Sequence, residues 1–161
     1  MDKKILVVFY SRTGTTKKIA QQIANFLSCD VEEIIDKKDR SGARGFMSGG
    51  KDAMRRNLTE INTIEKDPSN YDIIVIGTPV WAANMTPAVR TYISKYKDRF
   101  KNVAFFCTTG GTGIERTLIE MEVLCDKKPV ATFSVTSRQM KSEIYPGFNE
   151  FIETIKNWNK L

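Results

Sequence analysis

Short apolar runs recur along the chain, each bounded by turn residues or charges. Four of them, at residues 5–10, 73–77, 103–108 and 130–135, are apolar at nearly every position rather than at alternate ones. Such runs are typical of strands in a parallel sheet, because helices cover both faces of that sheet. Residues 31–35 predict a further short strand. We therefore expect five strands, most of them buried.

Between these runs, apolar side chains recur at helical spacing. Residues 15–27 are amphipathic, with Ile19, Ile23, Phe26 and Leu27 separated by charged and amide side chains. Similar spacing predicts further helices near residues 46–57, 89–96, 114–121 and 148–155. Alternating strands and helices favour right-handed crossovers and helices on both faces of a parallel sheet. The predicted fold is an α/β three-layer α/β/α sandwich, doubly wound around a five-stranded parallel sheet.

Length and composition suit one compact domain over residues 1–161, since the chain is 41% hydrophobic. Its apolar runs are too short to span a bilayer, and the start Met-Asp-Lys-Lys leads into a strand instead of a signal peptide. We therefore expect a cytoplasmic protein with no membrane span. Cys29, Cys107 and Cys125 have no C-x-x-C spacing, which argues against a disulfide framework or a zinc site.

The chain contains no histidine, which removes the usual general base and the commonest metal ligand. We predict no dedicated catalytic residue and no metal site, and we expect any chemistry to belong to a cofactor. The net charge is +6, and residues 36–56 carry seven Lys/Arg against three Asp. A basic face suits an acidic protein or an anionic ligand. Without aromatic-interleaved basic motifs or a helix-turn-helix pattern, it does not indicate nucleic-acid binding.

The turn after the first strand, Ser-Arg-Thr-Gly-Thr-Thr at residues 11–16, leads directly into the first helix. Backbone N–H groups at a helix N-terminus favour an anion, and four hydroxyl side chains add neutral donors. The turn lacks the Lys-Ser/Thr pair of the P-loop and the spaced glycines of the dinucleotide fingerprint. It predicts a site for a phosphate monoester. The alternative is that Ser11 and Thr13 only cap the helix and Gly14 only permits the turn.

Two further loops follow the third and fourth strands and should meet the first at the carboxyl edge of the sheet. Residues 78–87 hold two prolines and Trp81, a candidate stacking platform for a planar ligand. Residues 108–113, Thr-Thr-Gly-Gly-Thr-Gly, can approach a ring closely with their backbone. The alternatives are a core or interface tryptophan and an ordinary turn. Together the three loops offer a phosphate cradle, an aromatic plate and a polar backbone edge, which suit flavin mononucleotide (FMN).

On these motifs the chain resembles the flavodoxin family over essentially its whole length. Residues 11–16 are similar to the family's phosphate loop, and residues 78–81 and 108–111 are similar to its two flavin-ring loops. The resemblance implies strand order 2-1-3-4-5, noncovalent FMN and electron transfer between redox proteins. It also implies FMN contacts from Ser11, Arg12, Thr13, Gly14, Thr15, Thr16, Thr78, Pro79, Val80, Trp81, Ala82, Thr108, Thr109, Gly110 and Gly111.

Two departures from the family pattern keep alternatives open. Residues 108–113 contain no aromatic side chain, where flavodoxins commonly place a tyrosine, and this chain is basic where many flavodoxins are acidic. Residues 79–85 are also similar to a loop of the quinone-reductase branch, including its Asn-Met pair. We expect an electron carrier, a monomer or weak dimer, that serves a reductase and an electron acceptor, with acidic partners as candidates. The alternative is a small FMN-dependent NAD(P)H:quinone-type oxidoreductase.

Overall fold

The computed structural model describes residues 2–159. Within them the strands are β1 (Ile5–Phe9), β2 (Asp30–Glu33), β3 (Ile73–Pro79), β4 (Val103–Thr109) and β5 (Thr132–Thr136). All neighbouring strands pair in parallel, in the order β2-β1-β3-β4-β5. The predicted five-stranded parallel sheet and its order are confirmed. The carboxyl ends of all strands therefore lie at one edge of the sheet.

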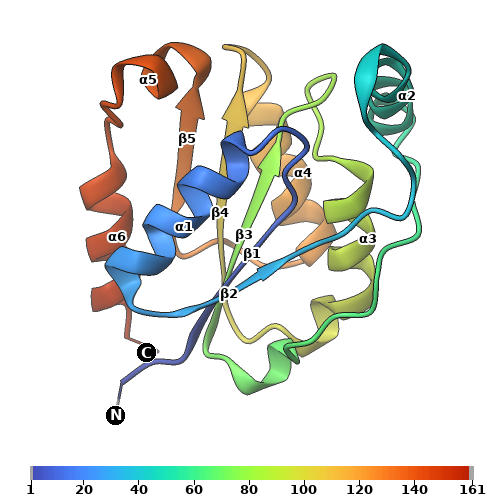
Figure 1. The fold of residues 1–161 in the computed structure, drawn as a ribbon. Coiled ribbons are helices and arrows are strands. Elements are labelled where there is room, and N and C mark those ends of the chain that lie inside the picture. The colour runs from blue at the N-terminus through green and yellow to red at the C-terminus, as the bar shows by residue number, and fades with distance from the viewer. Residues whose placement is uncertain (1, 160–161) are drawn as a thin grey trace.

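Helices cover both faces of this sheet (Figure 1). The described helices are α1 (Thr15–Leu27), α2 (Gly42–Met54), α3 (Pro87–Tyr96), α4 (Ile114–Cys125), α5 (Ser137–Ser142) and α6 (Phe148–Asn157), with 3₁₀ turns at Pro68–Asn70 and Lys97–Arg99. Figure 1 shows α1 and α6 on one face and α3 and α4 on the other. The three-layer sandwich is confirmed. No helix within residues 2–159 has the length and apolar character needed to cross a membrane.

The sheet is buried on both faces because alternate residues of each central strand enter different cores. In β1, Leu6 and Val8 belong to the core under α3 and α4, whereas Val7 and Phe9 belong to the core under α1 and α6. All four side chains are 0–1% exposed. This double burial explains the near-continuous apolar runs of the sequence. It also fixes each strand in the sheet, and with it the position of the loop that follows the strand.

Helix α2 differs most from the sequence-based expectation. It begins at Gly42 rather than near residue 46, ends at Met54, and lies beside the carboxyl edge of the sheet (Figure 1). Its buried positions are the small residues Gly45, Gly49 and Ala53. A Cβ on Gly45 would lie 2.0 Å from the Arg40 carbonyl carbon, so close backbone packing requires glycine there. Tertiary packing therefore overrides the low helix propensity of this glycine-rich segment.

Buried ion pairs hold α2 against the rest of the fold. The Arg40 guanidinium, whose side chain is 3% exposed, bonds Asp36 at 3.1 Å and Asp52 at 2.6 Å. Burial tends to raise the pKa of Asp52, but hydrogen bonds from Arg40, Lys38 and Asn57 outweigh it and hold that pKa well below its usual range. A single arginine thus joins Asp36, which follows β2, to Asp52 in the last turn of α2.

The cysteines do not form a reactive or cross-linked set. Cys107 and Cys125 are buried, Cys29 is half-buried, and all three are free. Desolvation raises the pKa of the Cys107 thiol to about 12, which keeps it protonated and unreactive near neutral pH.

Candidate functional site

The loops after β1, β3 and β4 meet at one cavity of about 210 Å³ at the carboxyl edge of the sheet. This is where ligands bind in open α/β sheets, beside the point at which the strand order reverses. The predicted residues that line the cavity are Ser11, Arg12, Thr13, Thr15, Thr16, Pro79, Val80, Trp81, Thr108, Thr109 and Gly110. The cavity thus draws on all three predicted loops.

The loop between β1 and α1 supplies hydrogen-bond donors at a helix N-terminus. Gly14 adopts a left-handed φ of 98°, which lets the chain turn into α1. Its N–H donates to the Ser11 hydroxyl at 3.0 Å, which braces the turn. The N-cap is Gly14, and no side chain caps the helix, so Ser11 and Thr13 do not have the capping role that the alternative assigned to them. Thr13 and Thr15 line the cavity from exposed positions. The first turn of α1 contains no acidic side chain, which leaves its positive end open to an anion.

A buried hydroxyl contact joins the first loop to the third. Thr16 and Thr108 are 1% and 5% exposed, and their Oγ1 atoms lie 2.8 Å apart. Both residues also line the cavity. The contact therefore fixes the distance between the turn at residues 11–16 and the end of β4.

Trp81 has a packing role and a cavity-lining role together. It lies edge-on to Tyr10 with ring centroids 5.6 Å apart. On α2, a Cβ added to Gly49 would lie 2.7 Å from Trp81 Cζ3, so the helix backbone packs closely on the indole. Trp81 is nevertheless only half-buried and lines the cavity. Trp81 can therefore pack at an interface and also serve as a platform for a ligand, because its contacts with Tyr10 and Gly49 fix the ring that lines the cavity.

A tight two-residue turn presents Trp81. The Trp81 N–H donates to the Asn84 carbonyl at 2.9 Å, and the Asn84 N–H donates back at 3.0 Å. Between them, Ala82 and Ala83 have φ values of 50° and 58°, in the left-handed region that disfavours a side chain. The Asn84 side-chain amide donates to the Ala82 carbonyl at 2.8 Å and braces the turn.

We expect Ala82→Gly to raise the free energy of unfolding of the apo-protein by about 0.5–1 kcal/mol. The left-handed conformation costs an L-residue about 1–2 kcal/mol, and glycine would avoid this cost. Glycine also gives the unfolded chain more conformational freedom, which cancels part of the stabilisation. Ala82 is exposed, so its methyl group contributes little packing. Urea denaturation measures the change. The control Ala43→Gly, at an exposed position in α2, should have the opposite sign; a loss of stability in both variants would contradict the argument.

Four predicted residues are not brought into the cavity lining. Thr78 is 0% exposed; its hydroxyl donates to the Pro79 carbonyl at 2.8 Å and accepts the Thr86 N–H at 3.1 Å. It therefore fixes the start of the β3 loop from within. The other three are Gly14, Ala82 and Gly111, and each lies in one of the three loops without lining the cavity.

The cavity also includes residues that sequence reasoning missed: Phe46, Val135, Ser137 and Met140. Ser137 and Met140 belong to α5, which directly follows β5, and the Ser137 hydroxyl donates to the Thr109 carbonyl at 3.4 Å. Applying the carboxyl-edge rule to β5 as well would have found them. Phe46 comes from α2, whose position beside the site no local pattern indicates.

Arg12 connects the turn at residues 11–16 with the start of α2. Its Nε donates to the Arg40 carbonyl at 2.7 Å, and its Nη2 donates to the Gly42 carbonyl at 2.9 Å. The same guanidinium lies over the Phe46 ring, 5.7 Å from the centroid. The side chain predicted to meet a phosphate thus also holds the start of α2 beside the cavity.

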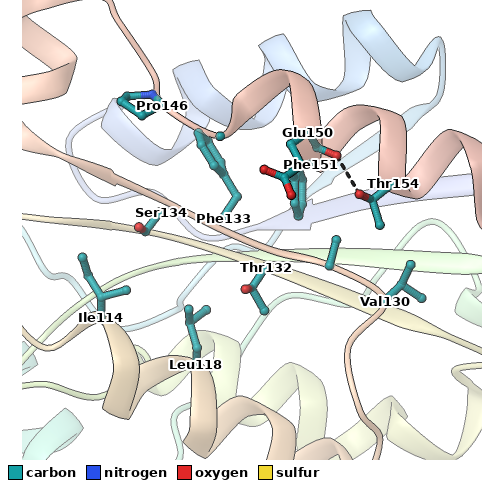
Figure 2. A pocket seen from close by; sticks show the side chains of 12 residues that line it. Ile114, Leu118, Val130, Thr132, Phe133, Ser134, Pro146, Glu150, Phe151 and Thr154 are labelled. Carbon is teal, nitrogen blue, oxygen red and sulfur yellow. Dashed lines mark hydrogen bonds between the residues drawn. The ribbon is translucent and has the colours of Figure 1, made fainter.

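A larger cavity, of about 570 Å³, lies elsewhere, at the free edge of β5 (Figure 2). Figure 2 shows Thr132 and Ser134 of β5 between Ile114 and Leu118 of α4 and, on the far side, α6. It shares no lining residue with the three-loop cavity. We place the candidate site at the smaller cavity, because it lies where three strand-end loops meet beside the switch point of the sheet. The first turn of α1 there contains no acidic side chain, whereas Glu150, in the first turn of α6, lines the larger cavity.

Solved structures with the same fold are numerous. A flavoprotein from Lactobacillus acidophilus, crystallised in complex with FMN, is 24% identical with a TM-score of 0.73, covering 87% of this chain and 97% of its own. A putative flavoprotein from Bacteroides eggerthii is 20% identical with a TM-score of 0.75, covering 88% and 96%. Oxidised Flavodoxin 1 from Bacillus cereus is 18% identical with a TM-score of 0.53, covering 97% and 99%. At these identities the likeness concerns the fold.

The sequence itself carries a second, independent likeness. None of the curated protein sequences compared with the chain matches it significantly. A family model described as flavodoxin, however, matches residues 4–143. That span runs from the start of β1 through α5 and contains all three loops of the site. The match and the confirmed strand order therefore agree: this chain belongs to the flavodoxin family.

Proposed function

We propose that this protein binds FMN noncovalently and carries electrons between redox proteins, receiving them from a reductase and passing them to an acceptor. The observation that carries the proposal is the convergence of three loops on one cavity with a helix N-terminus, hydroxyl donors and Trp81 in its lining. A relative of the same fold was crystallised with FMN, which supports the choice of cofactor.

The residues present suit each part of FMN. Ser11, Thr13 and the backbone at the start of α1 would hold the phosphate with neutral donors. Trp81 would lie against the isoalloxazine ring, and the backbone of residues 108–110 would bond its polar edge. The described residues that line the cavity include no acidic side chain. The bound flavin would supply the electron-transfer chemistry.

The shape of the site favours a carrier over an enclosed enzyme. The cavity of about 210 Å³ is smaller than ordinary ligand pockets, which hold about 300–1,000 Å³. Its rim residues Thr13, Thr15 and Gly110 are exposed, so part of FMN would lie in solvent. An exposed ring edge suits electron exchange with another protein. The absence of histidine from the sequence also fits a function without a dedicated acid or base.

Binding of FMN and of riboflavin, which lacks the phosphate, tests the cofactor assignment. The purified protein should be yellow, or should quench the fluorescence of added FMN. Thr13→Val removes a phosphate donor, so it should weaken FMN about tenfold and leave riboflavin nearly unchanged. Trp81→Ala removes a ring contact and should weaken both ligands alike. Fluorescence titration measures all four affinities.

The matched control for this test is Thr63→Val, an exposed threonine that is not part of the cavity. It should leave both affinities at their original values. A colourless protein that quenches neither ligand would disprove FMN binding. Equal losses of FMN and riboflavin in Thr13→Val would show that residues 11–16 are not the phosphate loop.

NAD(P)H oxidation separates the carrier from the alternative reductase. The FMN-loaded protein should oxidise NAD(P)H with a quinone only slowly when no reductase is added. Addition of a flavodoxin reductase should start electron flow through the carrier. Fast turnover by the protein alone would instead establish the small FMN-dependent NAD(P)H:quinone-type oxidoreductase.

A further inference from the structure

Helix α2 exposes large apolar side chains beside the candidate site. Phe46, Met47 and Met54 are 68%, 73% and 62% exposed. Exposed apolar residues that cluster, rather than occur singly, mark interaction surfaces. Methionine is common at surfaces that adapt to a partner, because its side chain is flexible and polarizable.

The outward side chains of α2 form an ordered stripe. Because an α-helix turns by about 100° per residue, they follow one another around the helix in a fixed order. That order is Phe46, Met54, Met47, Lys51, Arg44 and Arg55, all of them exposed. We call these six residues the α2 stripe. Phe46 adjoins the buried face of the helix, whereas Met47 and Lys51 lie on the side opposite Gly49.

The basic half of the α2 stripe is free to meet another molecule. None of the ion pairs among residues 2–159 includes Arg44, Lys51 or Arg55. By contrast, the nearby lysine Lys38 pairs with Asp52 at 2.9 Å. The stripe therefore carries three positive charges without an ion pair next to three apolar side chains. An apolar area with charged residues at its edge is typical of a protein interface.

The α2 stripe is also coupled to the cofactor site. Phe46 belongs both to the stripe and to the lining of the three-loop cavity. Gly49, one turn further along the helix, packs on Trp81, and Arg12 bonds the carbonyl of Gly42 at 2.9 Å. A molecule bound on the stripe would therefore lie next to the ligand in the cavity.

We propose that the α2 stripe docks an acidic protein that exchanges electrons with the bound flavin. The proposal rests on the electron-carrier function proposed above and adds the surface and the charge of the partner. Three unpaired cations select a partner with a complementary acidic face and accelerate its approach. Phe46, Met47 and Met54 provide the desolvated contact beside the flavin.

A protein partner fits the α2 stripe better than an anionic membrane. Only half of the stripe is apolar, and it is short, so little of it could enter a lipid interface. Electron exchange requires the partner to lie close to the flavin, and therefore beside the cavity. Binding to a lipid surface requires no such position.

The test uses a reduced plant-type [2Fe–2S] ferredoxin as an acidic, one-electron donor to the FMN-loaded protein. In stopped-flow measurements the cluster loses one electron and the flavin gains one. The second-order rate should fall as salt is added, because opposite charges attract. Arg44→Glu/Lys51→Glu should lower the rate at low salt at least tenfold and abolish that fall. Both residues lie outside the cavity lining, so FMN quenching should persist.

The matched control is Lys127→Glu/Lys128→Glu, which changes the net charge equally. These lysines also take part in none of the ion pairs among residues 2–159, and they lie in the loop between α4 and β5. The control should change the rate less than about threefold. Equal losses in both double variants would reduce the effect to net charge and overturn the proposal. A rate in the original protein that does not fall with salt would overturn it as well.

A second readout needs no flavin and therefore separates failure of docking from failure of FMN binding. In apo-protein labelled with ¹³C at the methionine methyl groups, oxidised ferredoxin should shift the signals of Met47 and Met54. The buried residues Met85 and Met121 are internal controls and should not move. Unchanged Met47 and Met54 signals would overturn the proposal. Sedimentation of the protein with phosphatidylserine vesicles, without these shifts, would assign the stripe to a membrane surface instead.

Discussion

Replacement of Arg40 by methionine is expected to release α2 from the fold. Arg40 lies between Asp36 and Asp52, and its side chain and that of Asp36 are each 3% exposed. Removing one partner of a buried ion pair leaves an uncompensated charge and costs about 3–5 kcal/mol. Because α2 sits at the periphery of the fold, we expect this cost to appear as local opening, while the sheet stays folded.

Amide hydrogen exchange of Gly42–Met54 measures the effect of Arg40→Met. Protection there should fall roughly a hundredfold or more, since each 1.36 kcal/mol corresponds to a factor of ten. Amides of β1 and β3 should keep their protection. The control Arg56→Met removes an ion pair to Glu120 in which the arginine is 59% exposed, and it should leave the protection of Gly42–Met54 nearly unchanged.

A triple variant makes the electrostatic origin of this effect testable. Arg40→Met/Asp36→Asn/Asp52→Asn removes the unpaired charges as well as the arginine, so it should regain part of the protection lost in Arg40→Met. If the triple variant is as open as the single one, Arg40 acts by packing and not by its charge. If Arg40→Met leaves α2 fully protected, the buried network does not hold the helix.

The second large effect is expected at Gly77 in the centre of the sheet. Gly77 of β3 is the Cα partner of Phe106 in β4, and the Phe106 ring lies over it. A Cβ on Gly77 would lie 2.0 Å from Phe106 Cζ, in a core where Phe106 is 0% exposed. Gly77→Ala should therefore lower the free energy of unfolding by about 3 kcal/mol, as overpacking of a dense core does.

Urea denaturation of the apo-protein checks the Gly77 prediction through a double-mutant cycle. Phe106→Leu makes room for the new methyl group. The double variant should therefore lose about 1 kcal/mol less stability than the two single variants lose together. Gly110→Ala is the control, because a Cβ there meets nothing within 4 Å. Additive losses in the cycle would refute the steric conflict between residue 77 and the Phe106 ring.

Much of the fold could be predicted because the relevant signals are local. The apolar runs at residues 5–10 and 73–77 are β1 and β3, and the amphipathic pattern over residues 15–27 is α1 with the same bounds. The three loops follow from the strands, since parallel strands deliver their carboxyl ends to one edge. Helix α5 was missed, because six residues with a capping box are too short for a periodic pattern.

The candidate site was predicted to the extent that it depends on strand ends. Trp81 and Thr13 line the cavity as expected, whereas Thr78 lies 0% exposed behind it. No spacing rule distinguishes these cases, because a threonine at a strand end can point toward the cavity or back into the loop. The direction is decided by partners distant in sequence, such as the Thr86 N–H that Thr78 accepts at 3.1 Å.

The sequence by itself determined the α/β alternation, the flavodoxin-like motifs and the three loops, because each depends on residues close together in the chain. Only the tertiary structure decided where α2 lies, and with it the place of Phe46 and the α2 stripe. Gly49 packs against Trp81, a contact that closes a long loop of chain and leaves no periodic trace in the sequence. A buried Arg40 then holds this arrangement, since its charge can be compensated only where Asp36 and Asp52 meet.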